Sequence, residues 1–141
     1  MGLQGACLDH VALNVQDVER AITFYTQVMG MEGLRLEEWR GGKVPFPSVR
    51  VSSTTIIDLF PGEMGGAADG QAPVGNHLNH FCLALSAAEH AQVCQRLETA
   101  GYAPTGPPAR RWGARGMATA LYFHDPDGNM IELRHYPEDG A

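Results

Sequence analysis

The sequence contains no long hydrophobic run and has few basic residues. No segment approaches the roughly 20 consecutive apolar residues that a membrane-spanning helix needs. Lys and Arg number 10 against 16 Asp and Glu, for a formal net charge of -6. The largest basic cluster is Arg110 and Arg111 with Arg115, which is too small for the electrostatic footprint of a nucleic-acid-binding protein. We therefore expect a soluble globular protein that binds neither membranes nor nucleic acid.

Cysteine is also scarce, and its placement excludes a disulfide framework. Cys7, Cys82 and Cys94 are odd in number, lie far apart and form no CxxC pair. This usage fits reduced thiols in a cytoplasmic protein. Cys82 lies in an apolar run and Cys94 on a helical face, so we interpret both as small buried hydrophobic residues. No catalytic cysteine is predicted.

The most informative feature that is present is an internal repeat. The stretch LDHVALNV at residues 8–15 returns as LNHFCLAL at residues 78–85, with histidine at the same place in each. Both stretches have the character of strands, and apolar residues at helical spacing follow each of them. The residues expected on the buried helix faces are Val18, Ala21, Ile22, Tyr25, Val28 and Met29 in the first helix, and Ala87, Ala91, Cys94 and Leu97 in the second.

Capping residues delimit both predicted helices. Asp17 can cap the start of the first helix, and Gly30 suits its end. Ser86 with Glu89 three positions later forms a capping box, and Gly101 closes the second helix. The two halves therefore begin alike, with a strand, a helix and a terminating glycine.

Three further strands are predicted in each half. Their expected positions are 33–40, 46–53 and 54–60 in the first half, and 102–113, 117–125 and 130–136 in the second. Residues 125–129 read DPDGN, which indicates a tight turn because proline presets its φ and glycine tolerates a positive φ.

These elements predict an α+β fold of two paired βαβββ modules that form a curved mixed sheet around a concave metal or ligand site. One domain is expected over residues 7–137. Its first module spans about 7–61, a Gly-, Ala- and Pro-rich linker about 62–77, and its second module about 78–137.

Each module also pairs a histidine on its first strand with a carboxylate on its last. The pairs are His10 with Asp58 and His80 with Glu132. Because side chains alternate along a strand, these four residues lie opposite the aliphatic face that a helix would cover. The aliphatic residues are Val11, Leu13 and Val15, Ile57 and Leu59, Phe81, Leu83 and Leu85, and Ile131 and Leu133.

The four polar residues fit a metal site. Two inward carboxylates need a compensating positive charge. A divalent ion supplies it, and nitrogen and oxygen ligands suit Zn, Ni, Mn, Fe or Co. The alternatives are ordinary ones: a hydrogen-bonded strand histidine, an Asp58 at a strand end, and a Glu132 paired with Arg134.

The remaining histidines are interpreted as structural or surface residues. His90 is expected on the exposed side of the second helix, and His124 adjoins the turn. His77 lacks a counterpart in the first half, and His135 shares the side of Ile131, away from Glu132.

The quoted motifs, with AITFYTQVMGM and LYFHDPDGNMIEL, resemble the vicinal oxygen chelate superfamily over about residues 7–136. This superfamily includes glyoxalase I, fosfomycin-resistance enzymes, extradiol dioxygenases and bleomycin-resistance proteins. The resemblance implies that His10, Asp58, His80 and Glu132 occupy the metal-ligand positions, with Asp58 where glyoxalase I usually has glutamate. It implies a lyase, isomerase or dioxygenase whose substrate chelates one divalent ion through vicinal oxygens, with Glu132 as the catalytic base.

The resemblance also implies where a substrate binds. Asn14 stands where glyoxalase I commonly has an arginine that helps to hold glutathione. Arg115 lies in a loop that borders the site in several small members, where it can contact an anionic substrate. Tyr122 is a candidate to line the cleft. A homodimer is expected, because small members often exchange modules between chains.

Two functions remain open at this point. One is the metal-dependent enzyme, and the other is a metal-free protein that sequesters a small molecule or antibiotic, as bleomycin-resistance proteins do. The sequence names neither the substrate nor the metal.

Overall fold

The computed structural model describes residues 8–62, 78, 80–113 and 115–137. Cys7, His77 and nearly all of the predicted linker lie outside the described residues. The chain divides into two compact units, Met1–Val74 and Gly75–Ala141, and each is considered by itself. Within the described residues, no helix combines the length and the apolar character needed to cross a membrane.

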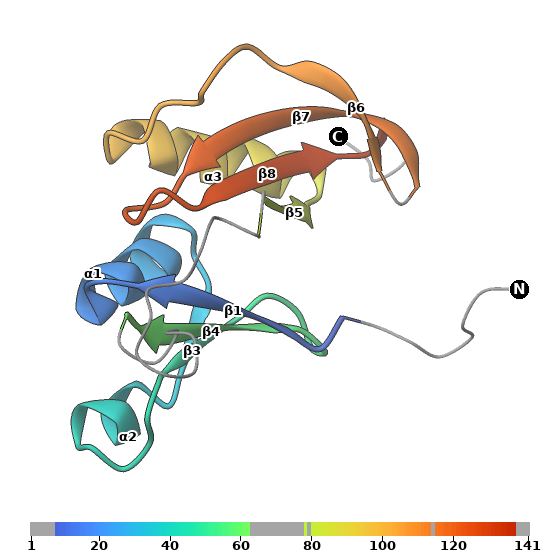
Figure 1. Ribbon diagram of the computed structural model, residues 1–141. Helices are drawn as coiled ribbons and strands as arrows, with labels where there is room; N and C mark the ends of the chain where they lie inside the picture. The colour runs from blue at the N-terminus through green and yellow to red at the C-terminus, as the bar shows by residue number, and fades with distance from the viewer. Residues whose placement is uncertain (1–7, 63–77, 79, 114, 138–141) are drawn as a thin grey trace, which may run out of the picture. The chain divides into compact units, whose positions relative to one another are not determined.

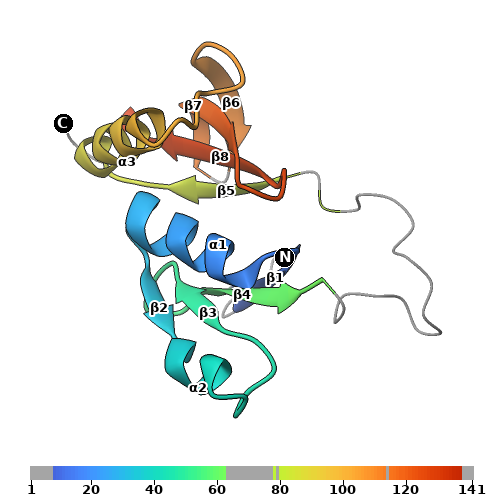
Figure 2. The same cartoon turned by 90° about the vertical axis from the view of Figure 1, so that its left-hand side faces the viewer.

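The first unit contains a four-stranded mixed sheet in the order β1-β4-β3-β2. Its strands are β1 (His10–Val15), β2 (Glu32–Leu34), β3 (Ser48–Arg50) and β4 (Ile56–Pro61). β1 and β4 run parallel, and the other neighbours are antiparallel (Figure 2). Leu13, Val15, Ile57 and Leu59 are buried, so the predicted aliphatic face is the core face.

One helical segment covers this face. α1 (Val18–Thr23) continues directly into a π-helical turn, η1 (Phe24–Val28). Asp17 caps α1 as predicted, because its Oδ1 accepts a hydrogen bond from the Arg20 amide at 3.0 Å. Gly30 ends the segment with a φ of 84°. Five of the six residues predicted to face the core are buried: Val18, Ala21, Ile22, Tyr25 and Met29. The sixth, Val28, is half-buried.

The strand predicted over residues 33–40 is wrong. β2 ends at Leu34, and α2 (Leu36–Arg40) follows after Arg35, which takes a left-handed φ of 59°. The alternation of Leu34 and Leu36 was misleading, because Leu36 turns back over Gly33. A Cβ on Gly33 would lie 2.5 Å from Leu36 Cδ1. The segment that follows, LEEWR, is rich in good helix formers and forms α2.

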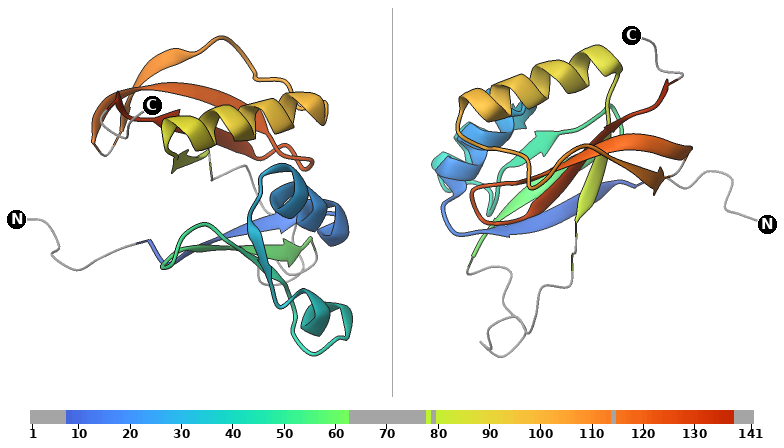
Figure 3. Two further views of the ribbon diagram at one scale, coloured as in Figure 1. Left: turned by 180° about the vertical axis from the view of Figure 1, so that it is seen from behind. Right: turned by 90° about the horizontal axis from the view of Figure 1, so that it is seen from above.

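The second unit repeats the same topology. Its sheet has the order β5-β8-β7-β6, again with one parallel pair, β5 and β8. The strands are β5 (Phe81–Ala84), β6 (Ala109–Gly113), β7 (Gly116–His124) and β8 (Met130–His135). α3 (Ala87–Thr99) lies along one face of this sheet (Figures 1 and 3). The predicted α+β class, with two mixed sheets, is therefore confirmed.

The buried face of α3 agrees only in part with the predicted one, since Leu97 is buried as predicted, Cys94 is half-buried and Ala91 is exposed. The capping box of Ser86 and Glu89 is present, but the residues facing the sheet are His90, Val93 and Leu97. His90 is thus buried, not exposed. Its Nε2 lies 3.2 Å from the Leu133 carbonyl oxygen, so the ring has a polar partner in the core. Burial lowers the pKa of His90.

The turn before β8 forms as predicted. Asp125 is buried, and its Oδ1 accepts hydrogen bonds from the amides of Asp127 and Asn129 at 2.9 and 2.8 Å. Gly128 takes a φ of 85°. The turn thereby fixes the start of β8, the strand that carries Glu132.

Candidate metal centre

Each sheet places its histidine and carboxylate in the same register. In the first sheet Ala12, two residues after His10, pairs with Asp58. In the second sheet Cys82, two residues after His80, pairs with Glu132. Strand alternation puts each pair on the face opposite the helix. The repeat seen in the sequence is therefore also a repeat in the placement of these residues.

The first pair is partly open to solvent. His10 Nε2 lies 3.9 Å from Asp58 Oδ2, with side-chain exposures of 52% and 9%. His10 Nδ1 lies 2.8 Å from Asp9 Oδ2. That hydrogen bond, followed by the charge of Asp58, raises the pKa of His10. A carboxylate on Nδ1 leaves Nε2 to face Asp58, which is the arrangement that orients a histidine ligand.

Asp58 has a second partner inside the sheet. Ser48 lies opposite it on β3 and donates a hydrogen bond to Oδ1 at 2.6 Å. Both residues are buried. Oδ1 is therefore held by the serine while Oδ2 faces His10.

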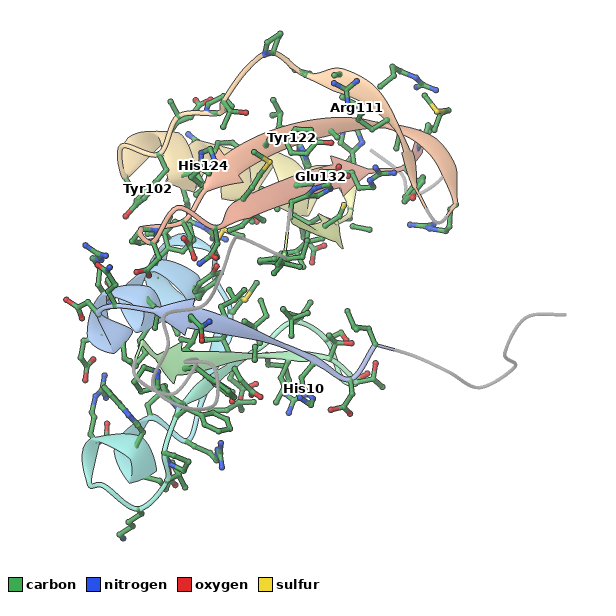
Figure 4. All side chains as sticks on the ribbon, viewed as in Figure 1. His10, Tyr102, Arg111, Tyr122, His124 and Glu132 are labelled. Atoms are coloured by element: carbon green, nitrogen blue, oxygen red, sulfur yellow. The ribbon has the colours of Figure 1, made fainter. Side chains whose placement is uncertain are left out.

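The second pair is closer and more enclosed. His80 Nε2 lies 3.6 Å from Glu132 Oε1, and only 3% of the glutamate side chain is exposed. Tyr122 donates a hydrogen bond to the same Oε1 at 2.5 Å, and its ring packs edge-on to His80 at 5.6 Å between centroids. Figure 4 shows Tyr122 and Glu132 on the neighbouring strands β7 and β8.

The other oxygen of Glu132 is fully engaged. Oε2 accepts hydrogen bonds from Cys82 Sγ at 2.9 Å and from Arg134 Nε at 2.7 Å, and Arg134 Nη2 lies at 2.6 Å. Burial alone would raise the pKa of Glu132, but the hydrogen bonds from Cys82, Tyr122 and Arg134 outweigh it and lower the pKa. The ion pair with Arg134, one of the ordinary alternatives, thus exists within β8.

Cys82 differs from its interpretation as a buried hydrophobic residue. The residue is exposed, and its thiol is a hydrogen-bond donor to Glu132. Desolvation of the sulfur and the adjacent carboxylate raise the pKa of Cys82 to about 12. The thiol therefore acts as a further donor that holds Glu132 Oε2.

The donor atoms of each pair fit a divalent metal ion. Imidazole nitrogen and carboxylate oxygen both bind Zn²⁺ and its neighbours at about 2.0–2.2 Å. The separations of 3.9 and 3.6 Å between the histidine Nε2 and carboxylate oxygen atoms are somewhat wider than the ligand-to-ligand distance of about 3 Å that such bonds give. Within the part of the chain that is described, no group of three or more His, Cys, Asp or Glu residues gathers as a metal site. Each unit thus holds a two-residue half-site.

The predicted substrate residues surround these pairs unequally. Asn14 is exposed on β1, on the face of His10. Tyr122 is bonded directly to Glu132. Arg115 is exposed, its guanidinium lies 4.1 Å from the Tyr136 ring centroid, and its amide donates to the Tyr136 hydroxyl.

Three supporting residues were missed from the sequence: Asp9, Ser48 and Cys82. Only Cys82 could have been identified as a supporting residue from the sequence, because it lies two residues from His80 and so shares its strand face. Ser48 belongs to another strand, and only the register with β4 places it against Asp58.

Comparison with known proteins identifies the family of the chain. Residues 7–133 match the Glyoxalase/Bleomycin resistance protein/Dioxygenase superfamily. The chain belongs to this superfamily. A lactoylglutathione lyase of Salmonella typhimurium is 34% identical over 129 residues, with 88% of each chain covered. A virulence protein of the same organism is 28% identical over 129 residues, covering 92% of this chain and 83% of its own.

A solved structure supports the fold of this superfamily member. An integron cassette protein of V. cholerae superposes with a TM-score of 0.72 at 25% identity, covering 96% of this chain and 99% of its own. The resemblance to the vicinal oxygen chelate superfamily inferred from the motifs is confirmed.

Proposed function

We propose that this protein is a divalent-metal-dependent, glyoxalase-like enzyme whose small substrate chelates the metal through vicinal oxygens. The observation that carries the proposal is the repeated half-site. In each unit a histidine Nε2 faces a carboxylate oxygen, at 3.9 and 3.6 Å, and the strand register is the same in both. Similarity to proteins named lactoylglutathione lyase supports an enzyme.

In this proposal His10, Asp58, His80 and Glu132 hold one Zn, Ni, Mn, Fe or Co ion, within one chain or between two chains. The ion, when bound, supplies Lewis-acid stabilisation of negative charge that develops on the substrate oxygens. Asp9 orients His10 through Nδ1, and Ser48 orients Asp58. These hydrogen bonds fix the ligands before the ion arrives and so reduce the cost of ordering them.

Glu132 is the proposed catalytic residue, and its Oε1 would take a proton from the substrate when that oxygen is not bound to the ion. Tyr122 donates a hydrogen bond to Oε1, which orients the carboxylate and stabilises its ionised form, the form that can act as a base. Arg115 and Asn14 are proposed to contact polar groups of the substrate, because both are exposed and lie in the unit of a half-site. The lyase, isomerase or dioxygenase character of the reaction is a matter for the assay.

The test is a screen of metal-reconstituted protein against methylglyoxal thiol adducts, fosfomycin and catechols. We expect turnover of one substrate class that requires the metal. The Glu132→Gln variant should lose this turnover, and the matched control Glu38→Gln, which changes an exposed residue of α2, should keep it. Tight binding of one of these compounds by the metal-free protein, without turnover, would instead establish a sequestering protein of the bleomycin-resistance type.

We further propose a cytoplasmic homodimer. Cys82 and Cys94 are free thiols, which suits a reducing compartment. The family resemblance supports the dimer. Light scattering at micromolar concentration should give the mass of two chains, and a monomer mass would contradict the proposal.

A further inference from the structure

Arg134 is the most unusual charged residue of the second unit. Only 3% of the residue is exposed, as for Glu132. Its Nε and Nη2 both approach the same oxygen of Glu132, Oε2, while Nη1 donates to the Tyr136 hydroxyl at 3.2 Å. A buried arginine that is fixed at three nitrogens has little freedom to move, and its partner is the carboxylate proposed to bind metal.

The hydrogen bonds divide the two oxygens of Glu132 into different roles. A carboxylate oxygen has two lone pairs. Oε2 has three donor atoms around it, two from Arg134 and the Cys82 thiol, and is saturated. Oε1 accepts one hydrogen bond, from Tyr122, and its remaining lone pair is available on the side of His80 Nε2, at 3.6 Å.

From this division we propose that Arg134 is a positioning residue that commits Glu132 to bind a divalent ion through Oε1 alone. The inference rests on the proposed function, since it concerns the same half-site. Arg134 and Cys82 hold Oε2, so the carboxylate cannot rotate to present both oxygens to the ion. A one-oxygen ligand leaves one more coordination position for the substrate than a two-oxygen ligand does.

Charge makes this positioning more important. The Glu132–Arg134 pair is neutral as a whole, so the net charge of this pair does not attract a dication. The metal affinity that Glu132 contributes must therefore come from a lone pair of Oε1 that points toward the ion. A lysine cannot replace the arginine here, because its single ammonium lacks the rigid planar fork that places two N–H groups on one oxygen.

The test compares Co²⁺ binding by wild type, Arg134→Lys, Arg134→Met and Cys82→Ala. Affinity is measured by titration calorimetry, coordination by the visible absorption of bound Co²⁺, and folding by circular dichroism. Arg110→Met is the matched control, because it removes an exposed arginine of β6 that takes no part in the half-site.

We expect Arg134→Lys to bind Co²⁺ about 10- to 100-fold more weakly than wild type, as replacements of residues that support ligands commonly do. The visible absorption spectrum of its bound Co²⁺ should also change. Cys82→Ala should weaken Co²⁺ binding and change the spectrum in the same direction, but by less. Arg110→Met should have the Co²⁺ affinity and the absorption spectrum of the wild type. If Arg134→Met fails to fold because it strands a buried charge, Arg134→Lys and Cys82→Ala still decide the question.

Wild-type affinity and spectrum in Arg134→Lys would overturn the positioning role while leaving the proposed function intact. Tighter binding by Arg134→Met with unchanged Arg134→Lys would show that charge alone matters, and would also overturn it. Absence of Co²⁺ binding by wild type would instead overturn the proposed function, and the positioning role with it.

Discussion

At the scale of single residues, the two proposed carboxylate ligands have very different surroundings. Glu132 is held by a guanidinium, a phenol and a thiol. Asp58 is held by one serine hydroxyl and faces a half-exposed His10. The buried Asp58 therefore depends heavily on Ser48, whereas Glu132 keeps several donors when any one of them is lost.

Ser48→Ala should accordingly destabilise the protein by about 1–3 kcal/mol, because it removes a short hydrogen bond to a buried charged group. The free energy of unfolding is measured by urea denaturation without added metal. Ser53→Ala, at an exposed loop position, is the matched control and should change it by less than about 0.5 kcal/mol. Equal stabilities of the two variants would show that Ser48 does not support Asp58.

The sequence predicted that each histidine lies on the same strand face as its carboxylate, but it did not predict the residues that support the two pairs. His10, Asp58, His80 and Glu132 stand out because strand alternation separates them from aliphatic neighbours and the repeat matches them. The donors from other strands, Ser48 and Tyr122 among them, depend on register, which no local pattern specifies. Arg134 was visible as a possible partner, but its complete burial was not.

At the scale of elements, local chemistry predicted both ends and most of the buried face of the first helical segment, and it predicted the start of α3. The buried face of α3 was predicted only in part, because Leu97 is buried as expected whereas His90 takes a core position that was assigned to alanine and cysteine. A histidine with a carbonyl partner competes successfully for such a position. The helix α2 was missed although its residues LEEWR include several good helix formers.

The capping box yields a prediction for α3. Ser86 accepts from the Glu89 amide at 3.2 Å, and Glu89 Oε2 accepts from the Ser86 amide at 3.1 Å. Ser86→Ala removes the first of these hydrogen bonds and should lower the free energy of unfolding by about 1 kcal/mol. Urea denaturation measures the change against the exposed control Ser53→Ala. A change of the same size in both would mean that the cap contributes nothing.

At the scale of the whole molecule, duplication is the organising feature. Both sheets share one strand order, with a parallel pair of first and last strands in each module. That pairing sets the histidine beside the carboxylate twice, and superfamily membership agrees with it. Each unit therefore holds one histidine and one carboxylate, and their nitrogen and oxygen atoms are donors of the kind that a divalent ion accepts.

The most direct test of this account is the metal content of protein purified without chelators and then dialysed. Elemental analysis should find about one divalent ion per chain in the wild type, which is the stoichiometry of one site. His80→Ala should lose most of it, while the control His124→Ala, at an exposed position beside the turn, should keep it. A wild-type protein that stays empty after incubation with Zn, Ni, Mn, Fe and Co salts would contradict the metal centre. Equal metal content in wild type and His80→Ala would contradict the ligand assignment.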